Sequence, residues 1–302
     1  MKKVVLFSSL CKSKEVLEVV LPSWLALDTE GIQLDILLYD DNNESKSITF
    51  LQEFEKKHPA VNIQRNWLQD NSSYKKHHWN KSLTDRIASI KNKAISYALE
   101  EGYDYVFLLD ADLVLHPNLL QHLLKCNKDF VFEVFWTVFH DQNYAKPNCW
   151  DIHSWNYIYP ETILQLQTPG TYKVGAGGAC TLLSRKALEK GLSFKRIENM
   201  PYAGEDRHIC TRAEVLDIPI YIDTHYPAFH VFKNEQSSEA QSWYDKGCDP
   251  TYFNAWLDEN WESEVSKLFE EAKVRVPKNT IEKYRLALYK AKRAFINYLR
   301  YH

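Results

Sequence analysis

The chain has 302 residues, of which 45% are hydrophobic and 14% aromatic, enough for one large α/β domain with a helical appendage. A net charge of −3 argues against a nucleic-acid partner. No apolar run is long enough to span a membrane as a helix, and the six cysteines form no CxxC pair, which argues against zinc and against a disulfide scaffold. We therefore expect reduced thiols in a cytoplasmic protein.

Strands and helices alternate along the first third of the chain. Short apolar runs predict strands over 4–10, 34–39, 61–63 and 105–109. Helical spacing of apolar residues predicts helices over 16–25, 48–54 and 83–99. The first apolar run resembles the start of a signal peptide, but Ser8, Ser9 and Lys12 interrupt it, so we interpret it as a strand. Alternation of this kind predicts a mostly parallel sheet with helices on both faces.

The middle of the chain continues this pattern less regularly. Further strands are expected over 130–135, 181–183 and 218–222, and further helices begin at Pro117, Ser184 and Arg207. Residues 136–160 are rich in aromatic side chains, which either pack or stack on a flat ligand such as a sugar. The glycine cluster at 175–178 either lets the backbone approach a ligand closely or only forms a turn.

Residues 236–302 differ in character from residues 1–235, and we interpret them as a C-terminal helical extension. Apolar spacing predicts one amphipathic helix over 253–269, and Pro277 separates it from a last helix over 281–298. Lysine and arginine surround the apolar stripe of that last helix. Such a helix either lies on an anionic membrane surface or packs against the body of the protein. Peripheral contact with the inner face of a membrane is therefore an open alternative to a purely cytoplasmic location.

Two carboxylates, Asp110 and Asp112, follow the apolar strand at 105–109 directly. Open α/β sheets bind their ligands at the carboxyl edge of the strands, so we expect a ligand site there. Two close carboxylates repel each other, and Mg²⁺ or Mn²⁺ that bridges to a substrate phosphate relieves the repulsion. A solvated turn is the alternative, because three-residue patterns of this kind are common.

Six segments resemble, in the same order, the motifs of GT-A glycosyltransferases, most closely those of family 2. They are Tyr39–Ser45, Ile90–Ile95 with Ala98, Asp110-Ala111-Asp112, Gly177–Cys180 with Ser184-Arg185, Glu205-Asp206 with Arg212, and Tyr226–His230. Each motif alone is weak evidence for the family, but a chance resemblance would have to place all six motifs in the same order. Lys91, Asn43 and Asp217 depart from the pattern, where arginine, glycine and glycine are usual. The resemblance covers residues 3 to about 232 and implies a Rossmann-like, three-layer α/β/α fold.

The resemblance also implies a reaction and a set of site residues. A hexosyltransferase would move a sugar from a nucleotide-diphosphate sugar, with a UDP-sugar favoured, to an acceptor hydroxyl. The implied donor-binding residues are Ser8, Ser9, Asp40, Asp41, Lys91, Asp110, Ala111, Asp112, Gly177 and Gly178. The implied ligands of Mn²⁺ or Mg²⁺ are Asp110, Asp112 and His230, with His225 as the competitor of His230. Asp206 would deprotonate the acceptor in an inverting reaction, and Glu205 would orient the acceptor or the donor sugar.

Two other function classes compete with this interpretation. A nucleotidyltransferase shares the sheet topology, but it usually carries a glycine- and arginine-rich loop after the first strand, where this chain has residues 8–12. A non-catalytic module that binds a sugar or a nucleotide would not need Asp206. The acceptor, whether a glycan, a lipid, a protein or a small molecule, is not evident, and we expect the aromatic segment and the tail to select it.

Overall fold

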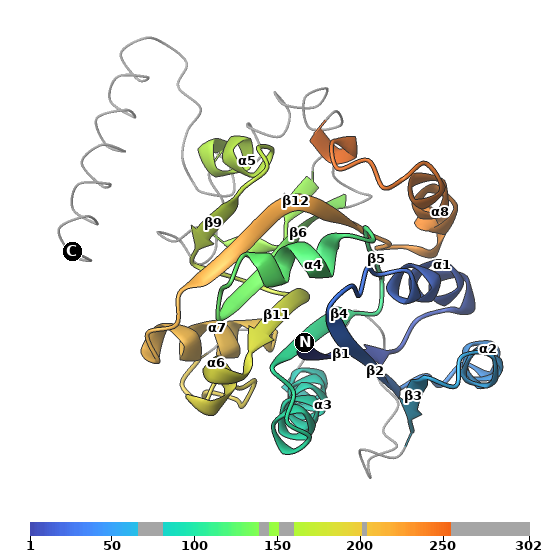
Figure 1. Cartoon of the computed structure of the whole chain (residues 1–302), viewed down its shortest axis with the longest axis horizontal. Coiled ribbons are helices and arrows are strands. Elements are labelled where there is room, and N and C mark those ends of the chain that lie inside the picture. The colour runs from blue at the N-terminus through green and yellow to red at the C-terminus, as the bar shows by residue number, and fades with distance from the viewer. Residues whose placement is uncertain (66–80, 139–144, 151–159, 201–203, 255–302) are drawn as a thin grey trace.

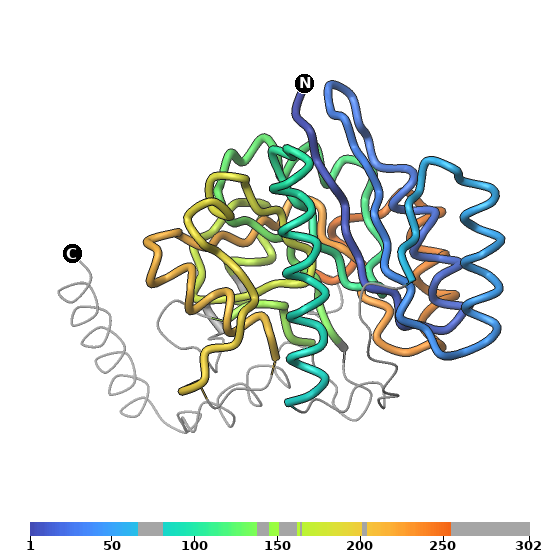
Figure 2. Tube along the Cα trace, turned by 90° about the horizontal axis from the view of Figure 1, so that it is seen from below, coloured from blue at the N-terminus to red at the C-terminus, as the bar shows by residue number. Residues whose placement is uncertain are grey.

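Parallel strands form the N-terminal half of a large sheet. The computed structural model describes residues 1–65, 81–138, 145–150, 160–200 and 204–254. The first strands are β1 (Lys2–Leu10), β2 (Ile32–Asp40), β3 (Val61–Gln64) and β4 (Tyr105–Asp110), joined by α1 (Lys14–Leu25), α2 (Ser45–Lys57) and α3 (Lys81–Glu100). They run parallel in the order β3-β2-β1-β4. Figure 2 shows β1 and β2 side by side, with α3 beside them. Their carboxyl ends therefore meet at one edge.

The second half of the sheet mixes strand directions. It contains β5 (Leu113–Val114), β6 (Phe130–Val138), β7 (Ala145–Pro147), β9 (Thr171–Val174), β11 (Cys180–Ser184) and β12 (Ile220–His230). β11 lies antiparallel between β4 and β6, β12 runs parallel to β6, and β5 runs antiparallel to β12. A separate pair joins β8 (Cys149–Trp150) to β10 (Ala176–Gly177). Within the described ranges, the large sheet has ten strands.

Helices cover both faces of this sheet, which confirms the predicted Rossmann-like α/β class. The remaining helices are α4 (Leu119–Lys125), α5 (Pro160–Leu166), α6 (Arg185–Glu189), α7 (Asp206–Val215) and α8 (Ser237–Asp245), with a 3-10 turn over Asn234–Gln236. In Figure 1, α3, α6 and α7 lie on one side of the sheet, and α1, α4 and α8 lie on the other. As predicted, Ser184 caps α6, since its hydroxyl accepts a hydrogen bond of 3.2 Å from the Ala187 amide.

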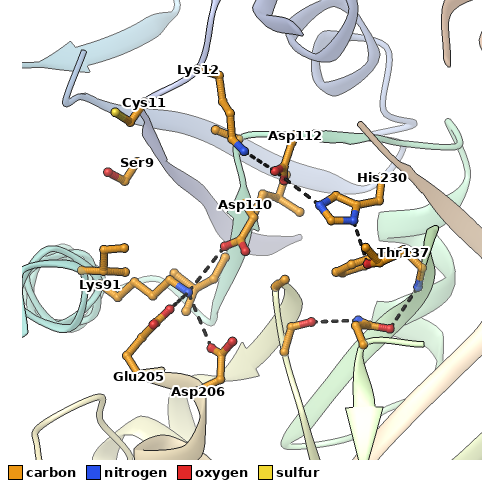
Figure 3. Close-up of a pocket in the computed structure, with 18 of the residues that line it drawn as sticks. Ser9, Cys11, Lys12, Lys91, Asp110, Asp112, Thr137, Glu205, Asp206 and His230 are labelled. Carbon is orange, nitrogen blue, oxygen red and sulfur yellow. Dashed lines mark hydrogen bonds and ion pairs between the residues drawn. The ribbon is translucent and has the colours of Figure 1, made fainter. Parts of the chain in front are cut away.

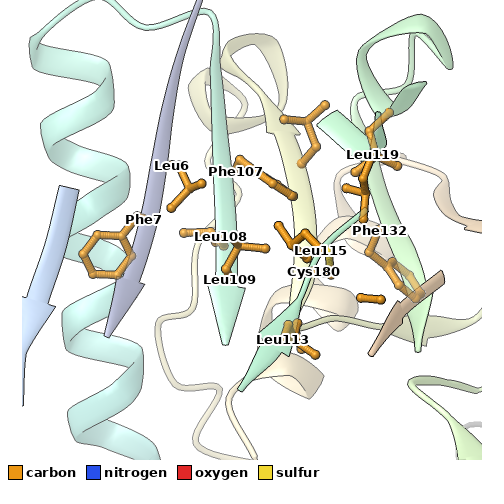
Figure 4. Packing of buried hydrophobic residues seen from close by; sticks show 14 of the residues in the cluster. Leu6, Phe7, Phe107, Leu108, Leu109, Leu113, Leu115, Leu119, Phe132 and Cys180 are labelled. Atoms are coloured by element: carbon orange, nitrogen blue, oxygen red, sulfur yellow. The ribbon is translucent and has the colours of Figure 1, made fainter. Parts of the chain in front are cut away.

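The core lies on both faces of the central strands. Leu6, Phe107 and Leu182 occupy one level of β1, β4 and β11 and are fully buried. Figure 4 shows Phe107 and Leu108 directed to opposite sides of β4, as the alternation of a strand requires. Because both faces are apolar until Leu109, the first polar side chains of β4 emerge at its carboxyl end. The apolar run of the sequence therefore fixes where the carboxylates begin.

Two differences from the predicted elements have physical reasons. β12 joins the strand predicted over 218–222 and the Tyr226–His230 motif into one element, Ile220–His230, because the strand resumes its pairing with β6 after the register shift between Asp223 and Ala228. β5 was not predicted, because a two-residue strand has no periodicity to detect. Both elements turn out to build the site.

The first part of the expected C-terminal extension packs on the same core. The rings of Trp243 and Phe253 lie 5.7 and 5.5 Å from the ring of Phe229 on β12, centroid to centroid, and all three side chains are buried. The predicted amphipathic helices beyond residue 254 lie outside the described residues. Among the helices that the structure describes, none combines the length and apolar character that a membrane crossing requires.

Phe107→Ala should destabilise the fold strongly, because Phe107 is 0% exposed at the centre of β4. We expect a loss of about 3–5 kcal/mol in the free energy of unfolding, measured by urea titration. Val215→Ala is the control, since Val215 is 80% exposed and its loss should change the free energy by less than about 0.5 kcal/mol. Equal midpoints for the two variants would contradict this account of the core.

Candidate active site

A cavity of about 430 Å³ opens at the carboxyl edge of β1 and β4. Its polar lining gathers side chains from segments that are far apart in the chain. These are Ser9, Cys11, Lys12, Lys91, Asp110, Asp112, Thr137, Asn148, Glu205, Asp206 and His230. Apolar side chains complete the wall, among them Phe135, Trp150 and Phe232. A concave, largely apolar site with a few convergent polar groups is the usual form of a small-molecule pocket.

One cluster in this cavity centres on Asp112. β5 pairs antiparallel with β12 so that Leu113 faces His230, and the Val231 amide donates a hydrogen bond of 2.8 Å to the Asp112 carbonyl. This pairing places His230 Nε2 3.4 Å from Asp112 Oδ2. The Lys12 ammonium, just past β1, forms an ion pair with the same oxygen (Figure 3). Three strand ends thus bring a lysine, an aspartate and a histidine together.

The charge of Asp112 is fixed by its neighbours. Burial by itself would raise the pKa of its carboxyl, but Lys12 and then His230 outweigh burial and hold that pKa well below its usual range. Asp112 is therefore ionised at neutral pH. On the far side of the imidazole ring, His230 Nδ1 shares a hydrogen bond of 2.9 Å with the Thr137 hydroxyl, which orients the ring.

A second cluster centres on Lys91, which is only 7% exposed. Its ammonium lies 2.7 Å from Glu205 Oε1, 3.5 Å from Asp110 Oδ1 and 3.6 Å from Asp206 Oδ1. Figure 3 shows the three carboxylates around this one nitrogen. Lys91 is therefore a buried lysine and does not face solvent from α3. The same lysine joins the carboxyl end of β4 to the first turn of α7.

Burial is the largest influence on the pKa values of two carboxyl groups in this second cluster, Asp206 and Asp110. It raises the pKa of Asp206 to about 7, with Glu205 and Asp110 adding to the shift and Lys91 opposing it. Burial also raises the pKa of Asp110, again against the effect of Lys91. A carboxyl group with a pKa near neutrality can exchange protons with a ligand at physiological pH. Asp206 therefore has the acid strength that a general base requires.

The glycine cluster shapes the floor between the two carboxylate groups. A Cβ at Gly178 would lie 2.9 Å from the Asp206 carboxylate, and a Cβ at Gly177 would lie 2.0 Å from the Phe132 ring. Neighbouring Ala179 has a φ of 78° and accepts a hydrogen bond of 3.0 Å from the Asp110 amide. Gly178 thus allows Asp206 to lie directly against the backbone, and Gly177 allows close packing below it.

The predicted site residues fall into two groups in the structure. Those that line the cavity are Ser9, Lys91, Asp110, Ala111, Asp112, Gly178, Glu205, Asp206 and His230. Ser8 does not line it, because successive side chains of β1 alternate and Ser8 is 0% exposed in the core. Gly177 lies beneath the floor. Asp40 and Asp41 lie outside the lining, and each forms an ion pair, with Arg65 at 3.4 Å and with Arg86 at 2.5 Å.

The structure also separates the two histidines that compete as metal ligands. His230 lies beside Asp112, whereas His225, within the irregular segment of β12, has its Nδ1 3.0 Å from Asp223 Oδ1. His225 is not among the residues that line the cavity. Of the two, His230 is therefore the histidine placed to share a ligand with Asp112.

Four side chains of the polar lining, Cys11, Lys12, Thr137 and Asn148, were not among the predicted site residues. Lys12 follows β1 at the same sheet edge, so its position after a strand was a usable signal. Thr137 and Asn148 carried no such signal, since they belong to the aromatic segment that lacks periodicity. Asn148 donates hydrogen bonds of 2.8 and 2.9 Å to the carbonyls of Gly178 and Glu133, so it ties the floor to β6.

The donor set fits a divalent cation. Asp112 Oδ1 is buried and accepts no hydrogen bond from the part of the chain that the structure describes. The lining holds four carboxyl groups against the two ammonium groups of Lys12 and Lys91, so negative charge is in excess when all are ionised. Carboxylate oxygens with one imidazole are ligands that Mn²⁺ accepts. Asp112 and His230 lie side by side at this edge, and Asp110 lies in the same lining with its carboxylate against Lys91.

Gly177→Ala and Gly178→Ala should differ in their effect on stability. The added methyl at 177 meets the Phe132 ring and the Asn148 carbonyl oxygen at 2.7 Å, so we expect a loss of about 1–3 kcal/mol. The methyl at 178 meets the end of the Asp206 side chain, which can move, so the loss should stay below about 1 kcal/mol. Urea unfolding measures both, and the reverse order would contradict the described floor.

A model of the protein family Anp1 matches residues 3–169. The match begins in β1 and extends through α5, so it includes Lys12, Lys91, Asp110 and Asp112, and it ends before Glu205, Asp206 and His230. A search of curated proteins finds no match. Because the family model covers more than half of the sequence, the chain belongs to the Anp1 family of glycosyltransferases, which is related to mannosyltransferases.

Proposed function

We propose that this chain transfers a hexose from a nucleotide-diphosphate sugar to an acceptor hydroxyl with inversion, and that Mn²⁺ or Mg²⁺ assists. The observation that carries the proposal is the presence in one cavity of an Asp112–His230–Lys12 cluster and a Lys91–Glu205–Asp206 cluster. The first suits an anionic leaving group, and the second contains a group suited to accept a proton. A protein that only bound a sugar or a nucleotide would have no use for the second.

The donor half of the proposal rests on charge. The Lys12 ammonium at the end of β1 supplies a fixed positive charge where a diphosphate would lie. A divalent ion on Asp110, Asp112 and His230 would stabilise, as a Lewis acid, the negative charge that develops on the departing diphosphate. The nucleoside would extend toward Ser9 and the Asp40 and Asp41 turn. The sequence favours a UDP-sugar, and the relation to mannosyltransferases adds GDP-mannose as a donor to be tested.

The acceptor half rests on Asp206. In a single displacement, the acceptor oxygen bonds to the anomeric carbon, the bond from that carbon to the diphosphate oxygen breaks, and the acceptor proton passes to Asp206. A pKa of about 7 matches that role, and Lys91 keeps the value from rising further. Glu205, held by Lys91 at 2.7 Å, is placed to orient the acceptor or the donor sugar. Trp150, on the cavity wall, offers an apolar surface for a sugar ring.

Donor binding should depend on the metal. With Mn²⁺ present, a ligand at about 100 times its dissociation constant adds about 2.7 kcal/mol to the stability of the native state, and the melting temperature rises accordingly. We expect a shift with one member of a panel of UDP- and GDP-hexoses, and its loss on adding a chelator. Asp112→Asn should lose the shift as well.

Asp217→Asn is the matched control for donor binding. Asp217 ends the turn after α7 with a φ of 52°, which asparagine tolerates, and it is exposed. This variant should bind the donor as the parent chain does. No shift with any nucleotide sugar, or an equal shift in Asp112→Asn, would refute the donor site. A shift with nucleoside triphosphates alone would favour the nucleotidyltransferase alternative.

Donor hydrolysis should require Asp206 in its ionised form. Asp206→Asn should lower kcat for hydrolysis by about 10²- to 10⁴-fold while leaving the donor-induced thermal shift in place, since it removes the base and not the donor site. Gly178→Ala, which displaces the same carboxylate, should lower kcat by up to about 100-fold.

The pH dependence of donor hydrolysis tests the role of Asp206 independently of mutation. Below the Asp206 pKa of about 7 the carboxyl is protonated and cannot accept a proton, so kcat/KM should fall about tenfold per pH unit there and level off above it. The profile is measured from about pH 5 to about pH 9 with saturating Mn²⁺. A flat profile, or an Asp206→Asn variant with full hydrolysis, would rule out Asp206 as the base.

A further inference from the structure

We propose that a second site, apart from the cavity, binds Zn²⁺ through His122, Cys126 and Asp223. The three residues, here called the α4–β12 cluster, come from the last turn of α4 (His122), from its C-cap (Cys126) and from β12 (Asp223), and α4 and β12 lie side by side in Figure 1. None of them lines the proposed active site. The cluster combines an imidazole, a thiol and a carboxylate, which is a donor set that zinc accepts.

The distances suit one ion among the three side chains. His122 and Cys126 are four residues apart, so they lie on the same face of α4. His122 Nε2 lies 3.3 Å from Asp223 Oδ1, Cys126 Sγ lies 3.4 Å from Asp223 Oδ2, and the three ligand atoms all lie within 4.8 Å of one another. Ligands of tetrahedral zinc, at bond lengths of 2.0–2.3 Å, are separated by about 3.4–3.8 Å. Small side-chain movements therefore bring all three to one ion.

Unsatisfied buried atoms around the cluster form an independent observation. Asp223 is 0% exposed, and its partner in the register of β6 and β12 is Glu133, which is also 0% exposed. Among the described residues, Glu133 Oε2 has no hydrogen-bond partner and His122 Nε2 has only its ion-pair contact with Asp223 Oδ1 at 3.3 Å, and both atoms are buried. Two carboxyl groups side by side in the core repel each other when both are ionised. A cation bound by Asp223 offsets the repulsion between the two carboxylates, and it can also be coordinated by His122 Nε2.

The surroundings also supply the supporting contacts of a metal site. The Thr171 hydroxyl donates a hydrogen bond of 2.7 Å to Asp223 Oδ2, which orients the carboxylate. His225 Nδ1 lies 3.0 Å from Asp223 Oδ1, and its ring centroid lies 4.1 Å from that of His122, so His225 helps to orient both ligands and a water would complete the coordination. The side chains of His122 and His225 are 25% and 34% exposed, which leaves a path for the ion.

The chemistry favours zinc over the ion proposed for the active site. A thiolate is a soft ligand that selects Zn²⁺ over Mn²⁺ and Mg²⁺, whereas the cavity offers oxygen and nitrogen ligands. On binding, the Cys126 thiol loses its proton to solvent, and the new thiolate and the Asp223 carboxylate balance the two charges of the ion. The site would then tie α4 to β12 at the irregularity of that strand.

Cobalt substitution tests the proposal, because Co²⁺ bound by a thiolate shows a charge-transfer band in the near ultraviolet. We expect the chelator-treated full chain to develop this band with one equivalent of Co²⁺ and to lose it when Zn²⁺ is added. Cys126→Ser should lack the band. Cys11→Ser is the matched control and should keep it, since Cys11 lines the cavity. Asp112→Asn should also keep it, which separates this site from the active site.

Affinity and stability supply a second measurement. Zn²⁺ should raise the melting temperature of the parent chain, and Thr171→Val should weaken zinc binding about 10- to 100-fold by removing the hydrogen bond to Asp223. Absence of a thiolate band in the parent chain, or a band that Cys126→Ser keeps, would overturn the proposal. In that case Asp223 and Glu133 share a proton instead. The parent spectrum remains decisive even if Cys126→Ser fails to fold.

Discussion

The ion pairs of Lys91 are the interaction on which the cavity depends. Its ammonium stands between carboxylates from the end of β4 and the start of α7. Lys91 and Glu205 are largely withdrawn from water, whereas the side chains of Asp206 and Asp110 are 29% and 45% exposed. Removing one partner from a buried charge pair costs about 3–5 kcal/mol, because the remaining charge is left uncompensated. Lys12 compensates Asp112 in the same way. The two lysines allow four carboxyl groups to share one cavity.

The mixed half of the sheet explains how these charges are assembled. A purely parallel sheet would offer only the ends of β1, β2 and β4. The antiparallel pairing of β5 with β12 returns the chain so that His230 lies beside Asp112, and β11 lies against β4 so that Ala179 accepts a hydrogen bond from the Asp110 amide. The parallel strands therefore supply the acidic edge, and the antiparallel strands supply its partners.

The sequence predicts those features of the site that depend on residues close together in the chain, and not those that depend on how distant strands pair. The apolar run before Asp110 places the carboxylates at a strand end, and Glu205 and Asp206 follow from motif order alone. The orientation of Ser8 and the partners of Thr137 depend on strand register, which a single sequence does not define. The absence of a CxxC pair argued against zinc, yet that rule concerns ligands that are close in sequence. A set such as Cys126 and Asp223 is joined only by the fold.

β12 connects the two proposed metal sites. Asp223 lies near the start of the strand and His230 at its end, and the register with β6 shifts between them. An irregularity of this kind bends a strand and increases its twist, so it can aim the two ends at different surroundings. It also leaves the strand less constrained by β6. Pairing with β5 holds the His230 end, and a metal at Asp223 would hold the other, so the position of His230 in the cavity would be set from both sides of the irregularity.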